Sequence, residues 1–349
     1  MALPPELNKS GDKINAKSGV GIILTAMLLV SMAFVPTVSA QANENVGVKA
    51  ENIDFSIEKE YGKLFLEKMG YSAELTSSIP LKNLEGNVEA VAFSVNNEGY
   101  IIINVNDLSV PEFSMTSENP FVDKNKNYYY NGPLAYVEGE LKSERIKTAY
   151  IYKKERVNKS KRLSELKKTS METSNVQLLS GASGILSHSL RTWEDNNIYC
   201  GPIAAGINLI YLDDYLDNDF VASGYENQND LLDFITNGYI DNSGTYAWQL
   251  RNGLNSYIED RNLANEYSAY AIAFDYSKLM SLIDDDKPVD VSTNNHPTFD
   301  DHWIIAHGYF VQDVPYVVPQ PYIVVNSGWG DNNINVLVGD YLINQVWIE

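Results

Sequence analysis

The segment NNIYCGPIAAGINLIYLDDYL, residues 196–216, is the most informative part of this 349-residue chain. Apolar residues recur at helical spacing from Ile203 to Leu216, with further apolar residues beside them, which predicts a strongly buried helix. Pro202 suits the first turn of that helix, where its missing N–H group costs nothing. Cys200 is therefore expected at or just before the helix N-terminus. The dipole and the free N–H groups there favour an anion, so they lower the pKa of a thiol and promote its thiolate.

Cys200 is the only cysteine of the sequence, which excludes an internal disulfide framework and a Cys-rich zinc site. A buried, inert cysteine is the commonest alternative for such a residue, and pairing between two chains is another. An inert residue would fit the middle of the helix. The predicted position at the N-terminus favours a nucleophile instead, and a thiolate nucleophile needs a base that a third group orients.

His302 is the favoured base among the four histidines. It lies in DHWIIAHGYFV, residues 301–311, an apolar run that predicts a strand. Since alternate residues of a strand face opposite sides, His302 and His307 cannot both face Cys200. His302 lies at the start of the strand, near a rim that a substrate can reach. His307 lies deeper and is expected to make a structural hydrogen bond.

Asn326 is the candidate for the orienting group. It ends PYIVVNS, residues 321–327, a second predicted strand that can pair with the His302 strand after a turn. A carboxamide oxygen near a ring N–H would fix the tautomer of the imidazole and keep its positive charge, which stabilises the thiolate. The alternative is a turn asparagine before Ser327 and Gly328, and this dipeptide alone favours the alternative.

Taken in order, these blocks resemble those of papain-like cysteine peptidases. NNIYCGPIAAG is similar to the Cys-helix block of the streptopain-like and bacteriocin-processing branch, and DHWIIAHGYF and YIVVNSGWGD are similar to the His and Asn blocks. GTYAWQLRNGLNSYI and FDYSKLMSLIDDDKPVDVS resemble the intervening helix and the short helix with its following strand in the bacteriocin-processing domains. The resemblance covers about residues 185–349 and needs no cofactor or metal.

This resemblance implies an α+β, papain-like catalytic domain, in which the cysteine lies at the N-terminus of a central helix packed on an antiparallel sheet. It assigns catalysis to Cys200, His302 and Asn326. One position departs from the family, which usually has a glutamine about six residues before the cysteine to donate to the oxyanion. That position holds Glu194, and an ionised carboxylate only accepts hydrogen bonds. The nearby amides of Asn196 and Asn197 are the candidates for the missing donor, whose loss typically costs ~2.7–4 kcal/mol.

The first forty residues predict an export signal. Three lysines in residues 1–18 precede an apolar run at 19–35 and small residues at 38–40. This order is typical of a bacterial-type secretory signal, residues 1–40, cleaved after Ala40. The alternative is a retained membrane anchor, because ~17 apolar residues are near the lower limit for a span. With the signal removed, we expect a soluble chain that is secreted or held at the cell surface and has no contact with the membrane.

Charge is distributed unevenly along the chain. The formal net charge is −20, and residues 181–349 hold 24 of the 46 acidic residues but 5 of the 26 basic ones. Such acidity argues against a sequence-independent nucleic-acid binder. Residues 142–168 hold 11 bases and 3 acids and grade into a Ser/Thr/Gly-rich stretch. We interpret residues 153–184 as a basic linker, either a solvated helix face or tail, or a processing segment.

Residues 41–152 predict a small α+β domain. A helix is expected over 53–69 and strands over 88–95, 99–105 and 147–152. NNEGYIIINVNDLSVPEFS, residues 96–114, resembles the inhibitory propeptide of streptopain-type zymogens. The resemblance implies that this domain is a pro-domain preceding the peptidase domain, residues 185–349, and blocking its cleft.

The sequence thus favours a secreted cysteine endopeptidase made as a zymogen, with protein or peptide substrates and its own pro-domain as an intramolecular inhibitor. One alternative uses the same three residues for another acyl transfer, such as transglutaminase-like or amidase chemistry. A second is a catalytically degenerate secreted binding protein, which the Glu194 departure would suit.

Overall fold

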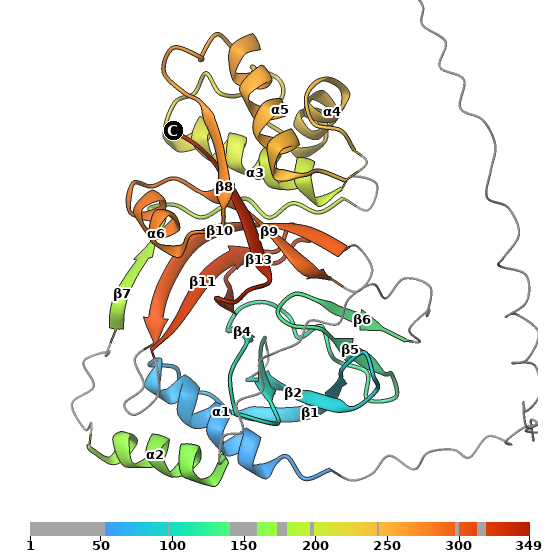
Figure 1. Cartoon of the computed structure of the whole chain (residues 1–349), viewed down its shortest axis with the longest axis vertical. Helices are drawn as coiled ribbons and strands as arrows, with labels where there is room; N and C mark the ends of the chain where they lie inside the picture. The colour runs from blue at the N-terminus through green and yellow to red at the C-terminus, as the bar shows by residue number, and fades with distance from the viewer. Residues whose placement is uncertain are drawn as a thin grey trace, which may run out of the picture. The chain divides into compact units, whose positions relative to one another are not determined.

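The computed structural model describes residues 53–96, 98–139, 159–172, 180–195, 199–242, 244–296, 300–312 and 319–349. Residues Asp54–Glu349 belong to one compact unit. The predicted signal and the predicted strand over 147–152 lie outside the described residues. The mixed α+β class is confirmed, since the described part contains both helices and a large sheet (Figure 1). The predicted domain boundaries stay predictions.

Six helices are present in the described residues; five of them form two groups, and α6 packs against β7, β9 and β10. Helices α1 and α2 pack against each other, and α3 packs against α4 and α5. Their bounds are α1 Ser56–Lys68, α2 Lys159–Glu172, α3 Cys200–Tyr215, α4 Gln228–Gly238, α5 Ala247–Asp260 and α6 Tyr276–Asp284. None of the helices in the described part is both long and apolar enough to cross a bilayer.

The described strands form one sheet of thirteen. Those of the N-terminal part are β1 Leu75–Lys82, β2 Val88–Val95, β3 Gly99–Asn104, β4 Glu112–Ser114, β5 Tyr128–Tyr130 and β6 Tyr136–Glu138. Those of the C-terminal part are β7 Ser180–Ile185, β8 Ala269–Ala273, β9 Val289–His296, β10 Asp300–Gln312, β11 Gln320–Asn326, β12 Ile334–Leu337 and β13 Leu342–Ile348. Their order is β6-β5-β1-β2-β3-β4-β12-β11-β10-β9-β13-β8, with β7 beside β10. Apart from β1 with β5, the neighbours are antiparallel.

Helix α3 is the buried helix that the sequence predicts. Every residue from Gly201 to Leu212 is buried, so the helix has no solvated face over three turns. It packs against β9 and β10 and is covered by α4 and α5. Gly201 allows its first turn to approach the chain before α5, because a Cβ there would lie 2.7 Å from Thr245 Oγ1. The first turn of α3 is thereby fixed between the sheet and residue 245.

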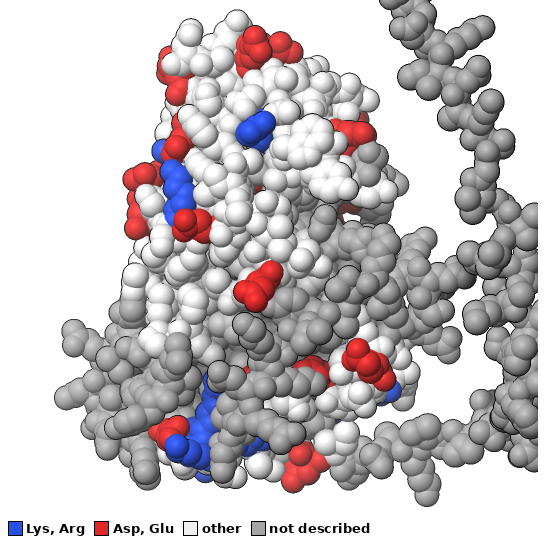
Figure 2. Space-filling view, in the orientation of Figure 1, with Lys and Arg blue, Asp and Glu red and all other residues white. Residues whose placement is uncertain are grey.

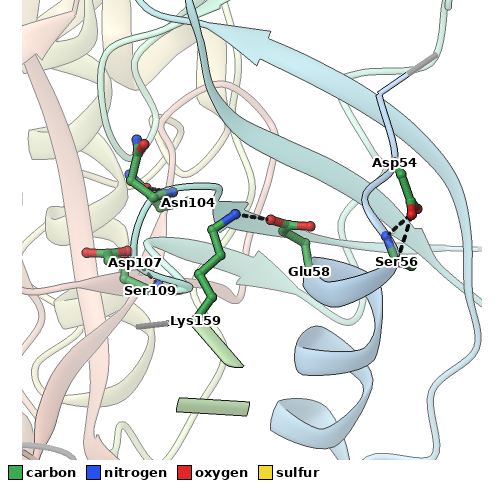
Figure 3. Close-up of polar contacts among 8 residues, drawn as sticks. Asp54, Ser56, Glu58, Asn104, Asp107, Ser109 and Lys159 are labelled. Carbon is green, nitrogen blue, oxygen red and sulfur yellow. Dashed lines mark hydrogen bonds and ion pairs between the residues drawn. The ribbon is translucent and has the colours of Figure 1, made fainter. Parts of the chain in front are cut away.

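Helix α2 lies inside the stretch that we interpreted as a linker. Leu163 and Leu166 of this helix are buried in the same apolar cluster as Phe65 of α1. Lys159 at its start reaches across to the buried carboxylate of Glu58, with 2.6 Å between Nζ and Oε1 (Figure 3). Residues 159–172 therefore fold onto the N-terminal part, because leucines spaced by three supply an apolar edge within a basic run.

The N-terminal and C-terminal parts share one sheet through β4 and β12. Phe113 pairs with Asn335, and Glu112 pairs with Val336. The shared contact is also apolar, since the rings of Phe113 and Tyr322 meet edge to face with 6.0 Å between their centroids. The Tyr322 hydroxyl donates to the Val110 carbonyl oxygen at 2.7 Å. Residues of both parts therefore form one core along this seam.

The uneven charge seen in the sequence is visible on the surface. Figure 2 shows acidic side chains scattered over the part that contains α3, α4 and α5, and basic side chains gathered near α1 and α2. Several of the basic residues of the C-terminal part are paired, as Arg191 is with Asp214 at 2.7 Å and Lys278 with Glu349 at 3.2 Å.

Candidate functional site

Cys200 is the first residue of α3, as predicted from the sequence. Tyr199 before it is extended, and its N–H donates to Asn242 Oδ1 at 2.7 Å, which fixes the entry of the chain into the helix. The thiol is partly exposed. The N-terminus of a helix favours an anion, so a cysteine at this position favours the thiolate over the thiol.

The sulfur of Cys200 contacts the strand that carries His302. The backbone N–H of Trp303 donates to Cys200 Sγ at 3.4 Å. The indole N–H of Trp303 donates to the Thr245 carbonyl oxygen at 2.8 Å, which ties the same residue to the loop packed on Gly201. The start of β10, the first turn of α3 and residue 245 thus form one contact group around the thiol. The structure brings Cys200 to the backbone N–H of the residue after His302, and the pairing of the thiol with the His302 ring stays a prediction.

The imidazole of His302 is held on two sides. Nε2 lies 2.7 Å from the Ser327 carbonyl oxygen. The ring also stacks on the indole of Trp329, with 3.6 Å between centroids and 12° between planes. Because a carbonyl oxygen only accepts, Nε2 carries the hydrogen in this contact, and in the neutral ring Nδ1 is then the basic nitrogen. The side chain is 1% exposed, so its orientation is set by protein groups.

The register of β10 explains how the chain after β11 reaches His302. Strand β11 pairs with β10 from Ile305 onward, where Ile305 lies opposite Asn326. The chain then turns away, with Gly328 in the left-handed region at a φ of 72°. A glycine suits this turn, because its φ is one that side chains with a Cβ rarely adopt. The turn brings the Ser327 carbonyl and the Trp329 ring onto the imidazole.

Asn326 is fully buried at the end of β11. Its Oδ1 accepts from the Gly328 N–H at 2.8 Å, and its Nδ2 donates to the Arg191 carbonyl oxygen at 3.2 Å. These bonds fix the turn that carries Ser327. Direct orientation of His302 by the Asn326 side chain stays a prediction, and the Ser327 carbonyl is an orienting contact that the sequence reasoning missed. A backbone carbonyl leaves no mark in the sequence, although Trp329 stood in the quoted block without an assigned role.

The other predicted site residues are placed less completely. The proposed oxyanion donors Asn196 and Asn197 lie outside the described residues. Glu194 lies beside the same turn, because a Cβ at Gly330 would be 3.0 Å from Glu194 Oε2. The Gly330 N–H donates to the Trp193 carbonyl oxygen at 3.2 Å, so the segment before Cys200 and the turn after Asn326 are directly joined.

His307 is buried on the same strand as His302. Burial lowers the pKa of His307 to about 4, since an imidazolium loses its hydration there, and this ring is neutral at neutral pH. Of the two remaining histidines, His188 stacks on Tyr215 with 4.0 Å between centroids. The side chain of His296 lies outside the described residues.

A buried carboxyl lies on β9, the strand that pairs with the strand of His302. Asp290 of β9 is fully buried and interacts with Asn208 of α3, and burial raises its pKa to about 8. In the unfolded chain an aspartate titrates near 4. The folded state therefore holds this proton more tightly, so the contribution of Asp290 to stability is complete below pH ~4 and is lost as the pH rises to about 8.

This linkage predicts the behaviour of Asp290→Asn. Relative to wild type, the variant should gain free energy of unfolding as the pH rises from 4 to 8, by at most about 1.4 kcal/mol per pH unit. Urea unfolding at pH 5, 6.5 and 8 measures this difference. The matched control is Asp340→Asn at an exposed position, which should follow wild type at all three values. If the free energy of unfolding of Asp290→Asn changed with pH in the same way as that of wild type, the burial argument would be contradicted.

No group of three or more His, Cys, Asp or Glu side chains suited to a metal ion is present among the residues that the structure describes. Comparison of the chain with protein-family models and with curated proteins gave no match.

Proposed function

We propose that this chain is a secreted cysteine endopeptidase made as a zymogen, with a papain-like arrangement of its catalytic groups. One observation carries the proposal. The Cys200 thiol at the N-terminus of α3 accepts from the backbone N–H of Trp303, the residue after His302, and the His302 ring is held by the Ser327 carbonyl and by Trp329. The resemblance of the three sequence blocks to those of papain-like peptidases supports the same reading. Export rests on the predicted signal over residues 1–40.

In the proposed mechanism, the Cys200 thiolate attacks a peptide carbonyl carbon and forms a tetrahedral intermediate. His302, protonated by the thiol, gives its proton to the leaving amine as the C–N bond breaks. The thioester that remains is hydrolysed by a water that His302 deprotonates. The Ser327 carbonyl holds Nε2 during both steps, so Nδ1 keeps its direction. The Cys200 N–H, with Asn196 or Asn197, would donate to the oxyanion.

Glu194 limits this mechanism, since its carboxylate cannot donate to an oxyanion while it is ionised. Its place beside Gly330, in the turn that also carries Trp329, supports a position close to the reacting groups. A peptidase needs another donor to the oxyanion in place of Glu194, whereas a catalytically degenerate binding protein does not.

The proposed inhibitor is the N-terminal part, because it contacts the strands of the site. The Asn131 amide donates to the Asn295 carbonyl oxygen at 2.8 Å, and the Asn295 amide donates back to the Pro133 carbonyl oxygen at 3.1 Å. Asn295 lies on β9 between Thr293, which pairs with His302, and His296, which pairs with Asp300. The segment Asn131–Leu134, here called the site loop, therefore lies against the strand next to His302.

Leu134 supports an inhibitory role for the site loop. Its side chain is 3% exposed and belongs to the apolar core of the C-terminal part, although the residue comes from the N-terminal part. Its φ of 58° lies in the left-handed region, which is rare for leucine and costs free energy. Two serines add contacts close by, since Ser114 and Ser117 donate to the carbonyl oxygens of Asn333 and Asn332.

This contact predicts that Leu134→Asp opens the site. A charge at this buried position has a high desolvation cost, so the site loop should leave the core. We expect the rate of Cys200 alkylation by iodoacetamide to rise at least about tenfold, which corresponds to ~1.4 kcal/mol in the opening equilibrium. Val122→Asp is the matched control, because Val122 of the same part is 74% exposed and its replacement should leave the rate unchanged. Equal rates in both variants would argue against inhibition by the site loop.

The products of the reaction test the function itself. An endopeptidase releases peptide fragments from an unfolded protein, whereas transglutaminase-like or amidase chemistry gives amine-crosslinked or deamidated protein of full length. Mass spectrometry distinguishes these outcomes. Fragments that appear with wild type and not with Cys200→Ala would support the proposal, and modified full-length protein would replace it by the acyl-transfer alternative.

A further inference from the structure

Glu112 is a buried acid at the seam between the N-terminal and C-terminal parts. It begins β4 and lies in register between Ile102 of β3 and Val336 of β12. The side chain is 0% exposed. A charged residue is almost never fully buried unless it is paired with an opposite charge or fully hydrogen-bonded. We therefore expect the Glu112 carboxyl group to have hydrogen-bond partners within the core.

Two donors hold the carboxyl group. The Tyr100 hydroxyl donates to Oε1 at 2.5 Å, and the Leu134 N–H donates to Oε2 at 2.7 Å. The second bond joins Glu112 to the site loop, which contacts Asn295 next to the His302 strand. One carboxyl group thus connects the seam to the segment that lies against β9, the strand next to the His302 strand.

The groups that face Glu112 are uncharged or acidic. Tyr100 approaches from β3 and Tyr136 from β6, and the pKa of each hydroxyl is raised chiefly by burial and further by the Glu112 carboxylate. Asp331, from the turn between β11 and β12, acts on Glu112 with a negative charge. Strand β12 contributes the uncharged Asn335 and Val336. Among the described residues that act on this carboxyl, none is basic.

The buried surroundings of Glu112 stabilise its neutral form more than its ionised form. A neutral acid satisfies both contacts, since its O–H can donate to Tyr100 while its carbonyl oxygen accepts from the Leu134 N–H. An ionised carboxylate keeps two hydrogen bonds but places a charge in the core, beside Asp331 and without a cation. Burial accordingly raises the pKa of Glu112 to about 7.

We propose that Glu112 is a pH-sensitive latch: its neutral form fastens the site loop over the candidate site, and its ionised form releases the loop. The inference concerns regulation and rests on the proposed function only for its biological meaning. In the released state Leu134 withdraws from the C-terminal core, and Cys200 and the His302 strand become accessible. The direction is loosening as the pH rises from acidic to slightly alkaline.

The size of the effect follows from linkage. If release returns Glu112 to an ordinary pKa near 4.5, the opening equilibrium grows about tenfold per pH unit between that value and 7. Above about pH 7 the carboxyl is ionised in both states and the effect levels off. Between about pH 4.5 and pH 7 the equilibrium constant for opening therefore rises by at most about 300-fold.

Hydrogen–deuterium exchange of the full chain tests the latch. The measurement uses a Cys200→Ala background, so that self-cleavage cannot alter the chain. It follows peptides that contain Leu134, from pH 5 to 8.5, after correction for the intrinsic pH dependence of exchange. Opening of the site loop should rise up to pH ~7 and then level off, while peptides of β2 stay protected throughout.

Glu112→Gln removes the charge and keeps the shape, since its amide can donate to Tyr100 and accept from Leu134. Its site loop should stay protected at all pH values. Glu85→Gln, at an exposed position of the same part, should behave like the unchanged background. A pH-dependent opening that persists in Glu112→Gln, or a flat profile in the unchanged background, would overturn the latch.

Tyr100→Phe keeps the test decisive if Glu112→Gln does not fold. The Tyr100 hydrogen bond lowers the pKa of Glu112, so its loss should move the midpoint of opening to higher pH. An unchanged or lower midpoint would contradict the latch. The readout does not involve catalysis, so a failed latch leaves the peptidase proposal intact, and a chain without peptidase activity leaves the exchange result intact.

Discussion

Replacing Cys200 by alanine should abolish peptide-bond hydrolysis, with kcat/KM at least about 10³-fold below that of wild type. The expectation follows from the place of the sulfur at the first residue of α3, in contact with the Trp303 N–H. No other cysteine exists in the chain to replace it. In the proposed mechanism the thioester is an obligatory intermediate, so removal of the sulfur removes the reaction path and not only part of its efficiency.

The assay for this variant uses an unfolded protein substrate after incubation of the chain at pH 8. Cys200→Ala should keep the far-UV circular dichroism of wild type, because Cys200 is partly exposed at the edge of the core and alanine suits a helix. Hydrolysis by Cys200→Ala at a rate near that of wild type would refute the assignment of the nucleophile.

Replacing His302 by alanine should raise the pKa of the Cys200 thiol towards its ordinary value near 8.5. In the proposed mechanism the imidazolium and the helix N-terminus together favour the thiolate of wild type. At pH 6 a thiol of ordinary pKa is ionised to well below one per cent, so alkylation of Cys200 by iodoacetamide should slow roughly 100-fold. Hydrolysis should be lost as well, because no other group would protonate the leaving amine.

The pH profile of alkylation distinguishes this electrostatic role from a structural one. From pH 8.5 to 6, the alkylation rate of His302→Ala divided by that of wild type should fall along the titration curve of a free thiol, because any pH dependence of access to Cys200 is common to both proteins. His188→Ala is the matched control, since that ring lies exposed and stacked on Tyr215. If His302→Ala and His188→Ala had the same profile, His302 would not be the partner of the thiol.

The sequence predicted those parts of the fold that depend on local patterns. An unbroken apolar helix after Cys200, alternation around His302 and a strand ending at Asn326 each carry a periodic signal, and α3, β10 and β11 confirm them. The helix over 53–69 was also found, as α1, although its buried face is carried by Tyr61, Phe65 and Leu66, while Ile57 is 38% exposed.

What the sequence could not predict are contacts between distant segments. The pairing of β4 with β12 joins residues more than 200 apart, and no local pattern specifies such a register. The site loop is another example, because Leu134 in a Gly-Pro turn gives no sign that its side chain enters another core. The Ser327 carbonyl and the buried carboxyl of Glu112 belong to the same class, since burial and backbone direction are set by the neighbours that the fold supplies.

The most direct test of the central proposal is the processing of the full-length precursor. The purified chain is incubated at pH 8 with and without iodoacetamide, and the N-termini of the fragments are mapped. The account predicts new N-termini between residues 140 and 184 in the untreated sample, and none in the alkylated sample or in Cys200→Ala. The same fragments after alkylation, or an intact untreated chain whose thiol reacts at the rate of an ordinary cysteine, would contradict it.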